Sequence, residues 1–149
     1  MSQMEPIATE YIKEPKISIR IALGVVSVLT LIAGLYGIIV GSMSSYSFTV
    51  AIHLTVGILG IVSGLFGIVG VNKKSSKIIT GFLIFYVAFS LFIIAIRLYF
   101  IAKAAAYSFR LVGWIAILSI PFYIACFSAV IYITIKYRKW LLREEIIEK

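Results

Sequence analysis

Residues 50–71 read VAIHLTVGILGIVSGLFGIVGV, and this stretch decides the fold. It holds no Asp, Glu, Lys or Arg, and about 20 apolar residues of helix are enough to cross the hydrocarbon core of a bilayer. Because lipid offers no partner for backbone amides and carbonyls, such a stretch is predicted to be helical. Its glycines share one broad helical face, and they are Gly57, Gly60, Gly64, Gly67 and Gly70. The stretch therefore predicts a membrane-spanning helix with one face almost free of side chains.

Three more apolar stretches extend this pattern to four predicted spans, which are residues 21–41, 50–71, 78–101 and 111–135. Arg97 is the only charged residue inside them. Across the chain 62% of residues are hydrophobic and 13% are charged, which excludes a soluble globular domain because such a domain needs a polar exterior. The sequence therefore predicts an all-α fold, a four-helix transmembrane bundle within residues 21–135.

The basic residues predict how this bundle is oriented. Three lie in the N-terminal arm 1–20, three in the connection 72–77 and five in the tail 136–149, so eleven of fourteen Lys and Arg residues fall on one side. By the positive-inside rule, both termini and this connection are expected in the cytoplasm. The tail mixes charges with Trp140 and aliphatic residues. It is predicted to be a basic amphipathic segment that lies partly along the membrane surface.

The net charge of +8 does not indicate nucleic-acid binding, because the basic residues stand beside span ends and form no patch on a folded surface. Membrane lipids are the expected partners of these side chains. Candidate contacts for lipid headgroups or a partner protein are Lys73, Lys74 and Lys77. Arg97 is a fourth candidate, since near the outer end of its span it either snorkels to the interface or meets a partner's acidic group or a lipid phosphate.

A second strip of glycines lies in the first span and consists of Gly34, Gly37 and Gly41. Small residues let membrane helices approach closely, so the first two helices are predicted to pack against each other along their glycine strips. Contact between subunits is an alternative use of the same faces, and a pore lining is another. The sequence leaves these alternatives open.

The chain lacks the side chains that intramembrane chemistry requires. It contains no Asp, and all 6 acidic residues are Glu in the two terminal arms, which argues against proton relays and aspartyl proteases. His53 is the only histidine and Cys126 the only cysteine, too few for a zinc site, a bis-histidine haem site or a Cys/His pair. No catalytic residue, metal site or cofactor is predicted, and the chain is not expected to be an enzyme.

One stretch resembles a known group of four-pass proteins. It comprises Leu23-Gly24 and Gly34, then GILGIVSGLFGIVG at residues 57–70, then NKKSSK at residues 72–77. A Ser-Gly step that runs into a short Lys-rich turn is similar to the membrane-spanning four-domains subfamily A, and the first two helices are similar to those of tetraspanins. The chain departs from tetraspanins because its third connection is short and has no Cys-Cys-Gly motif, and from subfamily A because its terminal arms are short.

These observations favour a non-enzymatic accessory or organising protein that packs laterally against itself or a larger membrane complex. One alternative is an oligomeric channel or transporter module whose Ser and Thr residues line a path between subunits. Another is a small structural subunit of an organelle's energy-converting complex. A plasma membrane or endomembrane is favoured over an organelle inner membrane, because the N-terminal arm is neither Arg-rich nor free of acidic residues.

Overall fold

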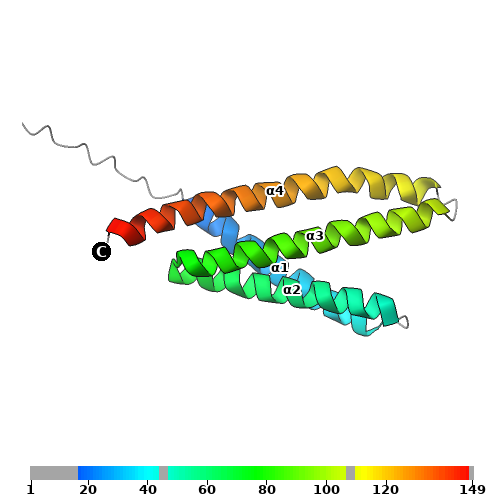
Figure 1. Cartoon of the computed structure of the whole chain (residues 1–149), viewed down its shortest axis with the longest axis horizontal. Helices are drawn as coiled ribbons and strands as arrows, with labels where there is room; N and C mark the ends of the chain where they lie inside the picture. Colours follow the sequence, from blue (N-terminus) through cyan, green and yellow to red (C-terminus); the bar gives the residue numbers. More distant parts are fainter. Residues whose placement is uncertain (1–16, 44–46, 107–109, 148–149) are drawn as a thin grey trace, which may run out of the picture.

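The computed structural model describes the backbone of residues 17–43, 47–106 and 110–147. Every regular element in these ranges is an α-helix, as Figure 1 shows. The helices are α1 (Ile17–Ser42), α2 (Ser47–Lys73), α3 (Ser76–Ala106) and α4 (Arg110–Ile147). The prediction of an all-α bundle of four helices is confirmed, and each helix extends beyond the span predicted for it. Most of the predicted N-terminal arm, residues 1–16, lies outside the described residues.

The four helices form two hairpins, α1 with α2 and α3 with α4 (Figure 1). The start of α1, the turn between α2 and α3 and the end of α4 lie together at one end of the molecule, which we call the turn end. From there the two hairpins diverge toward the opposite end, which we call the open end. Accordingly, α1 contacts α2 along its length but contacts α4 only sparsely.

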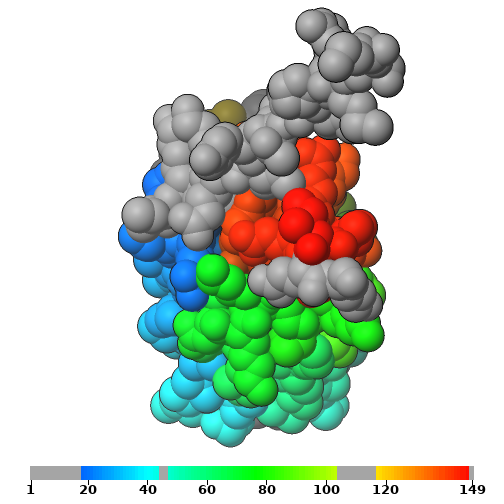
Figure 2. Space-filling model, turned by 90° about the vertical axis from the view of Figure 1, so that its left-hand side faces the viewer, coloured from blue at the N-terminus to red at the C-terminus, as the bar shows by residue number. Residues whose placement is uncertain are grey.

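The apolar core lies where the hairpins converge, at the turn end. Seven buried side chains from all four helices form it, and they are Leu23, Val71, Ile79, Phe82, Tyr86, Tyr137 and Leu141. Trp140 and Phe127 pack against this cluster. In Figure 2, which views the molecule from this end, the last turns of α4 lie directly against the start of α3. The core therefore joins the two hairpins at the turn end.

Glycines on α2 explain why α3 comes so close at the turn end. A methyl group on Gly70 would lie 2.7 Å from Cδ1 of Ile79, and one on Gly67 would lie 2.9 Å from Cδ2 of Phe82. Atoms at such distances overlap, so only glycine leaves room for the α3 side chains at these positions. The glycines of α2 thus allow close packing of α3 as well as of α1.

The turn between α2 and α3 is short, because α2 ends at Lys73 and α3 begins at Ser76. Lys74 takes a left-handed conformation with φ of 47°, and the Ser75 amide donates to the Gly70 carbonyl at 3.3 Å. This is the hydrogen bond of a Schellman motif, here built on a lysine where glycine is usual. The Ser75 carbonyl in turn accepts from the Ile79 amide at 3.1 Å, which starts α3.

The described residues of the predicted tail continue the last helix. Helix α4 continues without a break to Ile147, and both Tyr137 and Leu141 are only 1% exposed. These two residues lie four positions apart, so they share the face of α4 that meets the core. The tail is thus helical to Ile147 with an apolar face on the core, and its place on the membrane surface stays a prediction.

Candidate functional site

Four helices are long and apolar enough to cross a membrane. They cover Ser18–Ser42, Ser47–Lys73, Ser76–Lys103 and Ile117–Ile147. Because the number of helices is even and the connections between them are short, the start of α1 and the end of α4 lie at the same end of the molecule (Figure 1). Length and composition together define the architecture of a multi-pass membrane protein.

The glycine strips of α1 and α2 meet at van der Waals contact. A methyl group on Gly34 would lie 2.6 Å from the Ile61 nitrogen and 2.7 Å from the Gly57 carbonyl oxygen. One on Gly60 would lie 2.9 Å from the Gly34 Cα. The two backbones therefore touch directly, as close small-residue packing requires.

The remaining strip glycines extend this contact in both directions. Toward the open end, a methyl group on Gly37 would lie 3.3 Å from the Gly57 Cα, and one on Gly41 would lie 2.9 Å from the His53 Cβ. Toward the turn end, one on Gly64 would lie 2.7 Å from the carbonyl oxygen of Ser27. Within the described part of the chain, both strips are therefore occupied by intramolecular packing.

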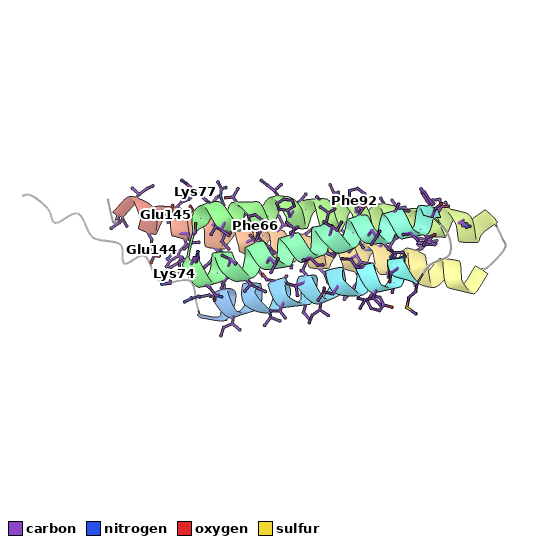
Figure 3. All side chains as sticks on the ribbon, turned by 90° about the horizontal axis from the view of Figure 1, so that it is seen from below. Phe66, Lys74, Lys77, Phe92, Glu144 and Glu145 are labelled. Atoms are coloured by element: carbon purple, nitrogen blue, oxygen red, sulfur yellow. The ribbon has the colours of Figure 1, made fainter. Side chains whose placement is uncertain are left out.

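The three lysines predicted as lipid or partner contacts gather at the turn end. Lys73, Lys74 and Lys77 are all exposed, and the Lys74 ammonium lies 6.0 Å from the centre of the Trp140 ring. Figure 3 places Lys74 and Lys77 beside Glu144 and Glu145, which come from the last turns of α4. Basic residues of the α2–α3 turn and of α3 thus lie beside acidic residues of α4.

Glu145 makes a contact that the sequence analysis did not anticipate. Its Oε1 accepts a hydrogen bond from the Ser76 amide at 3.0 Å, and its Oε2 accepts one from the Ser76 hydroxyl at 2.8 Å. Ser76 is the first residue of α3, so its amide has no partner inside the helix, and a carboxylate also suits the positive end of the helix dipole. The end of α4 therefore caps the start of α3.

Arg97 has a partner within the chain. Its guanidinium donates to the Tyr123 hydroxyl of α4 at 2.9 Å and lies 5.1 Å from the centre of the same ring. Tyr123 adds a partner to the three alternatives that the sequence left open for Arg97, namely the interface, an acidic group of a partner and a lipid phosphate. Tyr123 accepts a hydrogen bond from one of the five N–H donors of the guanidinium. Because Arg97 is exposed, its other donors can bind an acceptor outside the chain.

Four of the hydroxyl groups that could line a solute path bond to their own helices. Ser27, Thr30 and Ser90 donate to carbonyl oxygens four residues earlier at 2.7 Å, and Thr55 does so at 2.8 Å. The buried Ser63 hydroxyl has no partner among the described residues. Back-bonding of this kind satisfies a hydroxyl in an apolar surrounding without any partner helix.

A cavity of about 260 Å³ lies between α2 and α3 at the open end. Aromatic and aliphatic side chains form most of its wall together with one imidazole and one ammonium group, and the lining residues are Phe48, Thr49, Ile52, His53, Tyr99, Phe100 and Lys103. Phe48 and Tyr99 meet edge to face across the opening, with ring centres 5.9 Å apart. The cavity thus combines an apolar wall with a cation.

The four helices differ sharply in how much of them the fold covers. In the most apolar stretch of α2, 44% of the residues are buried, compared with 6% in α4. The uncovered surface of α4 includes Leu118, Phe122 and Ile124, as well as the small residues Ala125, Ser128 and Ala129. Helix α4 is therefore the element with most surface left for lipid or another helix.

No protein-family model, curated protein or solved structure matches this chain. The resemblance to subfamily A and to tetraspanins is therefore not supported by these comparisons. The fold defines the protein as a multi-pass membrane protein with four candidate spans. Among the described residues, no three His, Cys, Asp or Glu side chains are grouped as metal ligands.

Proposed function

We propose that this protein is a non-enzymatic accessory or organising component of a membrane complex, and that it associates laterally through α4. The observation that carries the proposal is the low burial of α4, of which only 6% is covered in its most apolar stretch. Lipid can cover such a surface, but a second feature favours a helix partner. Ala125 and Ala129 are exposed four residues apart, and a small-xxx-small pair lets another helix approach closely.

This assignment moves the association surface away from the glycine strips. Gly34, Gly57 and Gly60 are in contact with each other inside one chain, so they support folding and are not available to a second subunit. The alanines of α4 are exposed among the residues that the structure describes. A homo-oligomer or a complex with another membrane protein would both use this face.

The topology in the proposal follows the charge asymmetry. Among the described side chains, the turn end carries most of the basic residues, namely Arg20, Lys73, Lys74, Lys77, Lys136, Arg138, Lys139 and Arg143. Arg97 and Lys103 lie toward the open end. We place the turn end in the cytoplasm on the positive-inside rule, in a plasma membrane or endomembrane.

The channel alternative gains no support from the hydroxyl groups. Ser27, Thr30, Thr55 and Ser90 each use their hydroxyl proton on their own helix. A subunit role in an organelle complex would use the same α4 face. A plasma membrane or endomembrane is distinguished from an organelle inner membrane by the cell fraction in which the tagged protein is recovered.

The test measures the mass of the full-length protein extracted in a mild detergent, with an Ala125→Trp/Ala129→Trp variant. The wild type is expected to migrate well above its monomer mass, and the variant to shift toward the monomer because bulky rings block close approach. An Ile39→Trp variant is the control, since Ile39 is 56% exposed on α1. A strictly monomeric wild type, or a variant that assembles as the wild type does, would refute the proposal.

A further inference from the structure

The open-end cavity lies beside the first turns of α2, before the glycines of this helix begin at Gly57. From Gly57 toward the turn end, glycines let α2 approach its neighbours, and a methyl group on Gly60 would lie 3.1 Å from the Phe89 ring. Before Gly57 the residues facing α3 are larger, as Phe48, Ile52 and His53 show. The larger side chains hold α2 and α3 apart there, and the two helices diverge visibly in Figure 1.

The chemistry of the cavity suits an amphiphilic anion. Phe48, Ile52 and Phe100 offer an apolar wall, while Lys103 adds a positive charge and His53 adds an imidazole. No Asp or Glu occurs between Lys16 and Arg143, and the carboxylates of α4, Glu144 and Glu145, lie at the turn end, at the opposite end of the molecule from Lys103. An anion at the open end would therefore meet no carboxylate of the described helices there.

The position of the cavity along the helix matches the level of lipid headgroups. The 28 residues from Ser76 to Lys103 rise about 40 Å. A hydrocarbon core is about 30 Å thick, and about 40–45 Å separates the outer limits of the two headgroup regions. With Ser76 at one interface, Lys103 therefore reaches the headgroup region of the opposite leaflet, and Ile52 lies on its hydrocarbon side.

The size of the cavity decides between a lipid and a protein partner. A volume of about 260 Å³ accepts part of one hydrocarbon chain, whereas a helix with its side chains is about 10–12 Å across. We propose that the open-end cavity binds an acidic phospholipid of the surrounding leaflet. Part of one acyl chain lies against Ile52 and Phe100, and Lys103 contacts the phosphate. This proposal is independent of lateral assembly through α4.

The test uses the full-length protein in detergent micelles, with phosphatidylglycerol and phosphatidylcholine of identical acyl chains as probes and native mass spectrometry as the readout. The wild type is expected to retain phosphatidylglycerol several-fold more than phosphatidylcholine. Lys103→Gln removes this preference and Lys103→Arg keeps it. Lys139→Gln is the control, because Lys139 is an exposed lysine of α4 at the turn end.

A second variant tests the apolar part of the cavity. Ile52→Trp fills the cavity and is expected to lower retention of both lipids, whereas Ile58→Trp on the same helix is the control, since Ile58 is 56% exposed. Should Ile52→Trp fail to fold, wild-type protein is labelled with a photoreactive phosphatidylglycerol. Label is then expected on the peptides that contain residues 48–53 and 99–103.

These measurements test the headgroup contact and the site as a whole separately. An unchanged lipid preference in Lys103→Gln would overturn the role of Lys103 in binding the headgroup. Equal lipid retention by Ile52→Trp and Ile58→Trp, or photolabel spread evenly over all four helices, would overturn the site itself.

Discussion

The Glu145 carboxylate of α4 accepts hydrogen bonds from both the amide and the hydroxyl of Ser76, the first residue of α3. Ser76 is only 2% exposed, so its amide has little access to water once this partner is lost. The contact joins the last turns of the chain to the turn between the hairpins. It therefore closes the bundle at the end where all four helices meet.

Replacing Glu145 by Ala is expected to lower the free energy of unfolding by about 1–3 kcal/mol, because it leaves a buried amide without an acceptor. Unfolding of the purified protein in mixed micelles measures this loss, and hydrogen exchange should show faster exchange of the Ser76 amide. Glu144→Ala is the control and should change stability less. Equal effects of the two substitutions would show that the cap contributes nothing specific.

Gly34→Ala is expected to destabilise the protein by about 1–3 kcal/mol, since its methyl group would lie 2.6 Å from the Ile61 nitrogen. Gly24 on the same helix has no atom within 4 Å of an added methyl group. Gly24→Ala should therefore stay within about 0.5 kcal/mol of the wild type. Thermal unfolding in detergent compares the two variants, and indistinguishable melting temperatures would contradict direct packing of α1 on α2.

Leu141→Ala is expected to destabilise the protein by about 2–5 kcal/mol because Leu141 is 1% exposed and belongs to the core. Its neighbour Leu142 is 36% exposed, so Leu142→Ala should cost much less. The same unfolding measurement distinguishes them. If both substitutions were harmless, the last turns of α4 would not pack as the structure shows.

Tyr123→Phe removes the hydroxyl that accepts from Arg97 and keeps the ring beneath the guanidinium. A hydrogen bond between membrane helices contributes about 0.6 kcal/mol on average, so the loss is expected to be small. Tyr123→Leu also removes the ring and should cost more. Tyr132→Phe is the control because Tyr132 is 67% exposed. If this control lowered the free energy of unfolding as much as Tyr123→Leu does, the result would argue against the Arg97–Tyr123 pair.

The four helices could be predicted from the sequence because lipid excludes charged side chains and unsatisfied backbone groups from an isolated stretch. Contact between the glycine strips also followed from spacing, since residues three and four apart share a helical face. Both deductions use properties of a single segment. Hydropathy therefore located the spans, while glycine spacing located the face that α1 and α2 share.

Contacts between distant residues could not be predicted in this way. Ser76 and Glu145 are separated by 69 positions, and Arg97 and Tyr123 by 26. Nothing in the local sequence indicates which carboxylate reaches a helix start or which hydroxyl reaches an arginine. For a related reason the sequence did not show that Tyr137 and Leu141 of the tail are buried in the core, because charged residues surround them on the surface of α4.

The divergence of the two hairpins from the turn end gives the molecule the shape of a wedge (Figure 1). In a bilayer such a shape occupies more lateral area in one leaflet than in the other. Leaflets of unequal area are relaxed when the membrane bends toward the narrow side of the wedge. The open end of this protein would therefore displace more lipid from its leaflet than the turn end displaces from the other.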